Sequence, residues 1–288
     1  MIRQRLVQAA APIVQQGLGR VGLRVALTGG RAATILDDDR LIVSYPRSGN
    51  TWLSFLLTNL MHPEEPTTFL NLDHRCPDIH QRSNRYLLQL PRPRLMKSHE
   101  PFDGRYPRVV YLVRDPRDVA LSYHRFLAKV RVIEKTMPLP DFIDGFLTGA
   151  WDADRGAWGE HVGSWLGARG SGDAMLTLRY EDLHHSPEQQ LARVAEFLGI
   201  PNSPEACARA VSLATPERMR ELEAIETRRV RELKDTRTEI PFIGAAEVGV
   251  GRVELDARDQ ARIVERWRGT LEELGYEPSG RAPRRADE

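Results

Sequence analysis

The sequence is poor in the features that mark several special classes of protein. Its 288 residues include only two cysteines, Cys76 and Cys207, which excludes a disulfide framework and indicates a reducing, cytoplasmic environment. No stretch approaches the roughly 18 uninterrupted apolar residues that a membrane-spanning helix requires. An excess of positive charge is also lacking, since 41 lysines and arginines nearly balance 40 acidic residues, so bulk charge predicts no nucleic-acid partner. What remains is an ordinary globular composition, long enough for one large domain.

The charge that is present is unevenly distributed along the chain. Residues 1–36 hold five arginines and no acidic residue. A basic segment of this kind either packs as an arm or makes a peripheral contact with an anionic membrane surface, and both interpretations stay open. We therefore divide the chain into a basic N-terminal arm at 1–36, a main domain at 37–277 and a polar tail at 278–288.

Apolar runs and helical repeats alternate along the main domain. Short apolar runs predict strands at 41–44, 94–98, 108–113 and 175–180. Helical spacing follows the first run at 51–61 and the third from Pro116 onward, and a later helix has Ser186 as its N-cap and Gly199 at its end. A last helix ends at Gly275. Strands that alternate with helices predict a single α/β domain whose central, mainly parallel sheet is flanked by helices.

Residues 63–93, between the first predicted helix and the second strand, are rich in proline. We expect a loop-rich region there that forms a lid or a wall of the substrate site. Within it, side chains of metal-ligating types recur at every second position from His74 to His80, through Cys76 and Asp78. On one face of a strand these four would make a zinc site, an alternative against which the intervening Pro77 argues.

The first predicted strand-to-helix turn has the chemistry of an anion site. Residues 44–52 read Ser-Tyr-Pro-Arg-Ser-Gly-Asn-Thr-Trp, so the N–H groups of a helix start face the turn, and Gly49 permits close approach of a ligand. Arg47 adds a planar cation that suits phosphate or sulfate. The Walker A pattern is absent, which disfavours a nucleotide-dependent kinase. Short polar donors complete the turn, namely Ser48, Asn50 and Thr51.

Four segments, in this order along the chain, resemble one known family. YPRSGNTW at 45–52 resembles the 5′-phosphosulfate-binding loop of the cytosolic-type sulfotransferases, and MKSHEPF at 96–102 resembles the strand end that bears their catalytic histidine. RVVYLVRDPRDVALSYHRF at 108–126 resembles the segment that holds the donor's 3′-phosphate, and LRYEDL at 178–183 resembles a further family segment. The resemblance covers most of the main domain, and the sequence is similar to bacterial-looking members of the family. It implies the family's P-loop-like strand-loop-helix.

The resemblance implies a donor and the residues that bind it. The donor would be 3′-phosphoadenosine 5′-phosphosulfate (PAPS), and the products a sulfate ester and 3′,5′-adenosine bisphosphate (PAP). Arg47 would neutralise the leaving phosphate oxygen, and Arg114 and Ser122 would hold the 3′-phosphate. Trp52 and Tyr180 would face the adenine. The backbone that would cradle the 5′-phosphate belongs to Ser48, Gly49, Asn50 and Thr51.

Lys97 and His99 stand as in the family's Lys-[Ser/Thr]-His strand end, where the histidine is the general base. An acceptor hydroxyl is a weak nucleophile at neutral pH, and a positioned base that takes its proton contributes about 10²- to 10⁴-fold. Cationic side chains balance the donor's charge, so no metal is required. The resemblance thus implies a sulfotransferase acting on a hydroxyl of a small molecule, lipid or glycan. The sequence predicts neither the acceptor nor the oligomeric state.

One basic element of the family is missing from this chain. Family members carry Arg-Lys-Gly or Arg-[Ser/Thr]-Gly before the last helix, where this sequence has Gly244 and Ala245. Arg252 and Arg237 are the cations that we expect to replace that element in part. The loss leaves an alternative open, namely a degenerate, non-catalytic family member that binds PAP or a partner.

Overall fold

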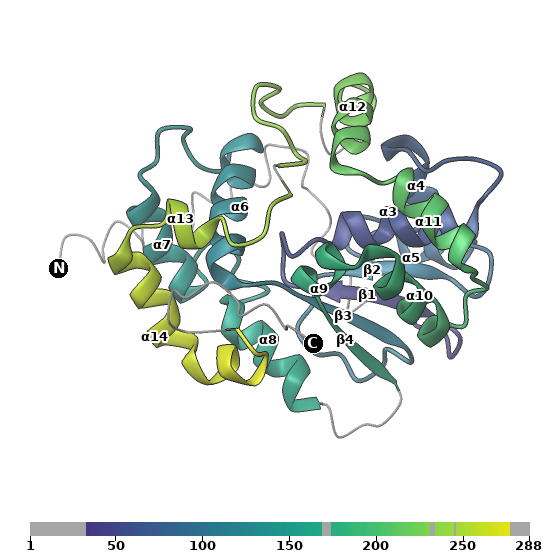
Figure 1. The fold of residues 1–288 in the computed structure, drawn as a ribbon, viewed down its shortest axis with the longest axis horizontal. Helices are drawn as coiled ribbons and strands as arrows, with labels where there is room; N and C mark the ends of the chain where they lie inside the picture. Colours follow the sequence, from purple (N-terminus) through teal and green to yellow (C-terminus); the bar gives the residue numbers. More distant parts are fainter. Residues whose placement is uncertain (1–32, 169–173, 231–233, 245, 277–288) are drawn as a thin grey trace.

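Four short apolar runs form the centre of the structure, a computed structural model that describes residues 33–168, 174–230, 234–244 and 246–276. The strands lie in the order β2-β1-β3-β4, and every neighbouring pair is parallel. Their bounds are β1 Arg40–Ser44, β2 Leu95–Ser98, β3 Val109–Val113 and β4 Met175–Arg179. The predicted parallel sheet is confirmed, and Figure 1 shows it between two groups of helices.

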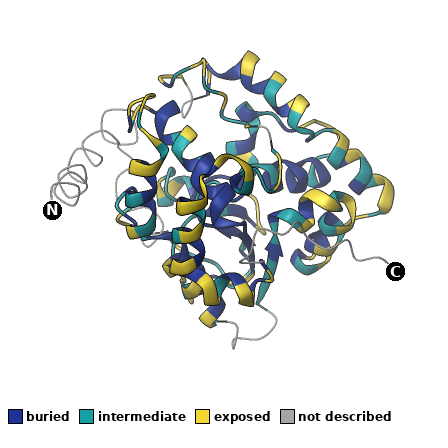
Figure 2. Ribbon diagram, turned by 60° about the vertical axis from the view of Figure 1, so that its left-hand side comes forward, coloured by how far each residue is buried: buried dark blue, intermediate teal, exposed yellow. Residues whose placement is uncertain are grey.

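The sheet separates two hydrophobic cores because alternate side chains of each strand point to opposite faces. In β3, Val109, Tyr111 and Val113 pack into one core, whereas Val110 and Leu112 pack into the other. All five residues of this strand are buried, as expected for a parallel strand covered on both faces. Buried residues accordingly fill the sheet and the inner faces of the helices in Figure 2.

One group of helices packs on the face of Val110. It consists of α3 (Asn50–Met61), α4 (Phe69–Arg75), α9 (Tyr180–His185), α10 (Pro187–Leu198), α11 (Pro204–Ser212) and α12 (Pro216–Glu226). The other face is covered by α6 (Pro116–Lys129), α7 (Leu139–Thr148), α8 (Trp158–Leu166) and α14 (Ala257–Glu273). The short helices α5 (Asn84–Leu87) and α13 (Gly251–Glu254) lie in connecting segments. Helices thus flank the sheet as predicted.

Several helix ends follow from local sequence. Helix α6 begins with Pro116 after Asp115, whose carboxylate accepts a hydrogen bond from Arg117 N at 2.9 Å. Helix α10 begins after Ser186 and ends at Gly199, which has a positive φ of 64°. The last helix is followed by Gly275, also as predicted.

Three expectations are refined, corrected or fall outside the structure. The segment 63–93 is mainly loop, as predicted, but it also contains the short helices α4 and α5, which Thr68 and Ser83 cap. Tyr180 does not end β4 but begins α9. Most of the predicted basic arm, at 1–32, and the polar tail lie outside the described residues. Among the described helices, none is long and apolar enough to cross a membrane.

The strand order locates a natural binding edge. The chain moves from β1 to one side to form β2 and then to the other side to form β3. Ligands of open parallel sheets bind at the carboxyl ends of the strands where such a reversal occurs. In this protein that point lies between the turn after β1 and the residue after β3, Arg114.

Candidate functional site

The turn between β1 and α3 depends on Gly49. This residue has a φ of 102° and precedes the first residue of α3. A Cβ atom at this position would lie 2.5 Å from the Tyr180 ring, so both backbone conformation and space require glycine. We call residues 45–52 the phosphate turn.

An unsatisfied hydroxyl lies in the phosphate turn. Ser48 is fully buried, and its Oγ atom has no hydrogen-bond partner. The Asn50 side chain instead faces inward, because its Nδ2 donates to Ile42 O at 3.3 Å and to Ser44 Oγ at 3.2 Å. Asn50 therefore braces the turn with its side chain, and the N–H groups at the start of the twelve-residue helix α3 face the turn. A buried hydroxyl without a partner beside such N–H groups fits an oxyanion ligand.

Arg47 lies at the centre of this edge in a positive-φ conformation of 69°. Its Nε donates to Ser122 Oγ at 3.1 Å and its Nη2 donates to Phe242 O at 2.9 Å. The guanidinium also lies 4.9 Å from the ring centre of Phe126 and 4.8 Å from that of Phe242. Burial, together with the nearby charge of Arg114, lowers the pKa of Arg47 to about 10, so it stays cationic at neutral pH.

Arg114 follows β3 and faces the same edge. Its Nη2 donates to Glu247 O at 2.7 Å and to Asp118 Oδ2 at 3.3 Å. The guanidinium lies 4.2 Å from the ring centre of Tyr180, while its buried Nε has no hydrogen-bond partner. Since Arg47 binds Ser122 and Arg114 contacts the ring that covers Gly49, the cations predicted for the two ends of the donor share one site.

Two aromatic side chains predicted to face adenine also meet. Trp52 and Tyr180 make an edge-to-face contact with ring centres 5.6 Å apart. Trp52 Nε1 donates to Ala214 O at 2.9 Å, and the Tyr180 hydroxyl donates to Ala246 O at 3.2 Å. Trp52, at the end of the phosphate turn, and Tyr180, at the start of α9, are thereby held against each other.

His99 follows β2 and contacts the end of β1. Its Nδ1 lies 2.7 Å from Ser44 O. A carbonyl oxygen only accepts, so Nδ1 carries the proton and Nε2 has the free lone pair. Burial lowers the pKa of His99 to about 4, against the opposing effect of the negative charge of Asp78. The imidazole is therefore neutral at pH 7 and has the tautomer that a base at Nε2 needs. Lys97 precedes it by two residues on β2, on the same face of the strand.

His161 supports the backbone at His99. Its Nε2 lies 3.1 Å from His99 O, and its Nδ1 lies 3.0 Å from the Tyr111 hydroxyl. Burial lowers the pKa of His161 to about 3, so its ring is neutral. No sequence pattern around His161 indicated this contact, since it depends on packing between α8 and β3.

The segment in which the family's basic element is missing crosses the site. Its backbone carbonyls accept hydrogen bonds from side chains that are predicted to bind the donor: Phe242 from Arg47, Ala246 from Tyr180 and Glu247 from Arg114. We call residues 242–251 the strap, of which Ala245 is outside the described residues. Gly251 was a sequence signal for close packing of this segment, because a Cβ atom at that position would lie 2.4 Å from the Arg117 backbone.

Two carboxylates anchor the strap. Glu223 of α12 accepts from the N–H groups of Phe242 at 2.6 Å and Ile243 at 2.9 Å. Asp118 of α6 accepts from those of Gly249 at 2.9 Å and Gly251 at 2.7 Å. The segment is therefore held near both ends by charge-assisted hydrogen bonds.

The expected substitutes for the missing basic element lie elsewhere. Arg237 donates to Ile133 O at 3.2 Å, beyond the end of α6, and Arg252 lies 3.8 Å from Asp115. Instead, Arg220 of α12 approaches Gly244, with its Nε 3.4 Å from Gly244 O. A cation thus lies beside the position where the resemblance expected one, but it comes from a neighbouring helix.

The alternating His/Cys/Asp row does not form one strand face. His74 lies in α4 and bonds to the Tyr86 hydroxyl at 2.9 Å, while Cys76 is buried against Ser54. Within the part of the chain that the structure describes, no group of three or more His, Cys, Asp or Glu side chains could hold a metal ion.

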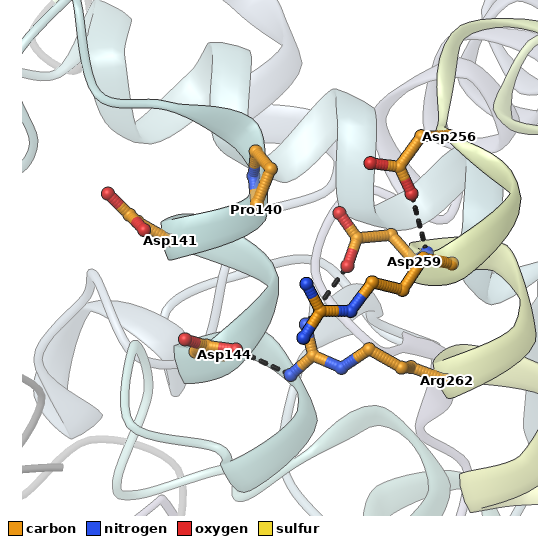
Figure 3. Close-up of a pocket in the computed structure, with 7 residues that line it drawn as sticks. Pro140, Asp141, Asp144, Asp256, Asp259 and Arg262 are labelled. Carbon is orange, nitrogen blue, oxygen red and sulfur yellow. Dashed lines mark hydrogen bonds and ion pairs between the residues drawn. The ribbon is translucent and has the colours of Figure 1, made fainter. Parts of the chain in front are cut away.

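A pocket between α7 and α14 lies apart from the residues of the phosphate turn. Figure 3 shows Asp141 and Asp144 on one side and Asp256 and Asp259 on the other, with Arg262 between them. Arg262 pairs with both Asp144 and Asp259, the latter at 2.9 Å, and Asp256 caps α14. These charges join the two helices.

Comparison with known proteins identifies the family. A family model described as "Sulfotransferase domain" matches residues 37–275. The chain belongs to the sulfotransferase domain family. It is 31% identical over 181 residues to the 3-alpha-hydroxysteroid sulfotransferase of Cavia porcellus, which covers 59% of this chain and 62% of that protein. It is 30% identical over 192 residues to Homo sapiens sulfotransferase 2B1, covering 63% of this chain and 52% of that one.

Solved structures support the same fold. Retinol dehydratase in complex with retinol and PAP has a TM-score of 0.70 at 22% identity, over 84% of this chain and 83% of that chain. Mouse sulfotransferase SULT7A1 complexed with PAP has a TM-score of 0.67 at 19% identity, over 91% of each chain. The α/β fold of this sulfotransferase-domain protein is therefore the one predicted from its strand and helix order.

Proposed function

We propose that this protein transfers a sulfuryl group from PAPS to an acceptor hydroxyl. The observation that carries the proposal is the convergence on one sheet edge of a buried, unpartnered Ser48 hydroxyl, two arginines and a neutral histidine whose tautomer is fixed. Anion-binding groups and a base meet there, as the transfer of an anionic group to a hydroxyl requires. The PAP that is bound in the two similar solved structures agrees with this donor.

In this proposal each donor-site residue has a separate task. The Ser48 hydroxyl and the backbone of Gly49, Asn50 and Thr51 hold the 5′-phosphate. Arg47 neutralises the phosphate oxygen that leaves. Arg114 and Ser122 hold the 3′-phosphate, which requires Arg114 to exchange its bond to Glu247 O for the ligand. The adenine lies against Trp52 and Tyr180, whose rings already meet at an angle.

The proposed chemistry needs one proton transfer. The donor supplies an activated sulfuryl group, and the acceptor oxygen forms a bond to its sulfur while the bond from sulfur to the bridging phosphate oxygen breaks. His99 takes the acceptor proton at Nε2, because Nδ1 is committed to Ser44 O. Lys97, on the same face of β2, balances the negative charge on the transferring group.

Binding of the product nucleotide is the first test. We expect PAP to raise the unfolding temperature of the full chain by several degrees, since a ligand at about 100 times its Kd adds about 2.7 kcal/mol. AMP, which lacks the 3′-phosphate, and ATP with magnesium are the comparison ligands. A shift with ATP–magnesium but none with PAP would contradict the proposed donor and favour a kinase.

A non-catalytic role is the second candidate, and one observation favours it. Arg47 and Arg114 are hydrogen bonded to carbonyls of the strap, and position 244 lacks the cation that family members carry there. A protein of this kind would bind PAP but transfer no sulfuryl group to any acceptor. Transfer from labelled PAPS to a panel of phenols, hydroxysteroids and sugars, with His99→Ala as the inactive control, distinguishes the two functions. The relatives named for hydroxysteroids place these acceptors in the panel.

We further propose a cytoplasmic location, which the two unpaired cysteines support. Membrane contact through the arginines of residues 1–36 is the associated alternative, and removal of that segment followed by vesicle sedimentation tests it.

A further inference from the structure

Asp78 lies beside the proposed base but has no part in the donor site described above. The segment around it runs along the free edge of β2. Lys97 N donates to Pro77 O at 2.9 Å, and Ile79 N donates to Lys97 O at 3.0 Å. These bonds place Asp78 directly opposite Lys97 in a parallel bridge. The segment around Asp78 thereby adds one parallel bridge to the edge of the sheet that leads to the proposed base.

The register of this bridge places Asp78 on the face of the proposed catalytic residues. Paired residues in adjacent parallel strands project to the same side, and residues two apart along a strand share a face. Asp78, Lys97 and Ile42 therefore form one row across three neighbours. His99 is one step further along the same face, beside Ser44, to which it is bonded.

The Asp78 carboxylate is buried and ionised. The residue is only 6% exposed, and its Oδ1 accepts from His80 N at 2.9 Å. Although burial raises the pKa of Asp78, electrostatic interactions with His80, His99 and Lys97 and the hydrogen bond from His80 N together hold it below its usual value. Burial of an ionised carboxylate destabilises the folded protein unless nearby positive charges or hydrogen bonds offset the loss of hydration.

Charged and titratable groups face His99 from every neighbouring element. Lys97 comes from β2, Asp78 and His80 from the segment along β2, Arg155 from the loop after α7, and His161 from α8. The charges of Arg155 and His80 disfavour a positive imidazole, whereas the charge of Asp78 favours one. The Ser44 carbonyl orients the ring but carries no net charge.

We propose that Asp78 is a positioning residue for proton transfer, whose carboxylate stabilises the imidazolium that forms on His99. The inference rests on the proposed function in taking His99 as the base. The acceptor proton moves to Nε2 of His99, and Asp78 stays ionised throughout. Arg155, whose charge disfavours the imidazolium, is itself paired with Asp152 at 2.8 Å, and Asp78 supplies a negative charge that favours the imidazolium.

An experiment on the full chain without substrate tests the electrostatic step directly. NMR titration of the histidine rings, with the His99 signals assigned from His99→Ala, measures the midpoint for protonation of His99. Asp78→Asn keeps an oxygen for the His80 N–H and removes the charge, so we expect the midpoint to move to lower pH. Asp78→Glu keeps the negative charge, so its midpoint should lie closer to that of the wild type than the midpoint of Asp78→Asn does. An unchanged midpoint in Asp78→Asn overturns the inference.

Glu100→Gln is the matched control. Glu100 follows His99 in sequence, but its carboxylate pairs with His80 Nδ1 at 3.3 Å. We expect this variant to leave the His99 midpoint in place. An equal shift in both variants would mean that any nearby negative charge acts in this way, and would overturn the specific role of Asp78. Should Asp78→Asn fail to fold, Asp78→Ser tests the same loss with a smaller side chain.

Turnover adds a readout that a structural role would not move. A phenol with a strongly electron-withdrawing group, such as 4-nitrophenol, is largely ionised in mildly alkaline buffer and needs no base, whereas phenol needs one. We expect Asp78→Asn to lower kcat for phenol by about tenfold or more and to affect 4-nitrophenol far less. Equal losses for both acceptors overturn the proton-transfer role. Absence of PAP binding and of any transfer in wild type would instead contradict the proposed function, and the NMR result would stand apart from it.

Discussion

The phosphate turn and the strap meet around Arg47, and they contribute to the proposed donor site in different ways. In the phosphate turn, the identity of each residue matters. There is no room for a side chain at Gly49, and the buried Ser48 hydroxyl has no hydrogen-bond partner. In the strap, the backbone makes the contacts, through carbonyls that accept from Arg47, Tyr180 and Arg114. A backbone contact constrains sequence weakly, since almost any residue offers the same carbonyl. The strap can therefore cross the site without basic residues of its own.

Replacement of Arg47 should have the largest effect. We expect Arg47→Ala to lower kcat/KM for PAPS by at least about 100-fold, because one preorganised donor to a developing charge contributes about this much. Arg47→Lys keeps the charge and should recover part of the loss. In the strap's neighbourhood, Arg220→Ala should change the same constant by only a few-fold, since that guanidinium is half-exposed and pairs with Glu217 at 3.6 Å. Equal losses from both arginines would contradict the difference between the two regions.

Two glycines give the next test, of space rather than charge. Gly49→Ala introduces a methyl group 2.5 Å from the Tyr180 ring at a φ of 102°, and should cost about 1–3 kcal/mol of stability. It should also weaken PAP binding by about tenfold or more, because the turn must shift. Gly244→Ala is the matched variant, since a Cβ there meets nothing within 4 Å. Thermal unfolding and PAP titration of both variants check this, and a neutral Gly49→Ala would show that the turn is adaptable.

The same contrast explains how much of the molecule could be predicted. The four strands and the order of the main helices follow from apolar runs bounded by Pro116, Ser186 and Gly199, where local patterns and tertiary packing agree. The geometry of the phosphate turn could be predicted because it depends on a required glycine, whereas its role in binding a phosphate stays a prediction. Helices α4 and α5 were missed because prolines nearby suggested loops, whereas the deciding signals were the caps Thr68 and Ser83.

The strap and Asp78 could not be predicted for a different reason. Their contacts join residues far apart in sequence, such as Arg114 with Glu247, and no local pattern reports such a pairing. Asp78 belonged to an alternating row of residues that suggested a metal site. Two other members of that row do not share its face, because His74 lies in helix α4 and Cys76 is buried in the core. Register across strands, which a single sequence does not reveal, gives Asp78 its place beside Lys97.

The pH dependence of stability distinguishes the region around His99 from the strap, because the strap contains no histidine. The pKa of His99 is lowered to about 4 and that of His161 to about 3, from an ordinary value of 6.5 in the unfolded chain. Between these values the unfolded chain binds more protons, so the free energy of unfolding rises with pH and is fully present only above about 6.5. We expect chemical denaturation to show stability falling as pH drops from about 6.5 toward 4. His99→Gln should flatten part of that slope, and an unchanged slope would contradict a neutral buried His99.

Restoration of a cation to the strap should have the smallest effect and is the most direct test of what was lost. Gly244 is exposed, has open space around its Cβ position and lies beside Arg220. Gly244→Arg should therefore be tolerated and should tighten PAP binding by about threefold to tenfold, the gain of one exposed charge-assisted contact. Because the added charge would act on the 3′-phosphate, AMP should gain little, and the difference should shrink at high salt.

The control for that gain is Gly269→Arg on α14, another glycine whose Cβ position is open. It adds the same charge to the whole molecule at a different place. If Gly269→Arg tightened PAP binding equally, or if AMP gained as much as PAP, the effect would be one of net charge and position 244 would have no special relation to the 3′-phosphate. If only Gly244→Arg and PAP show the gain, the strap lies over the 3′-phosphate, and a cation at position 244 strengthens its hold on that group.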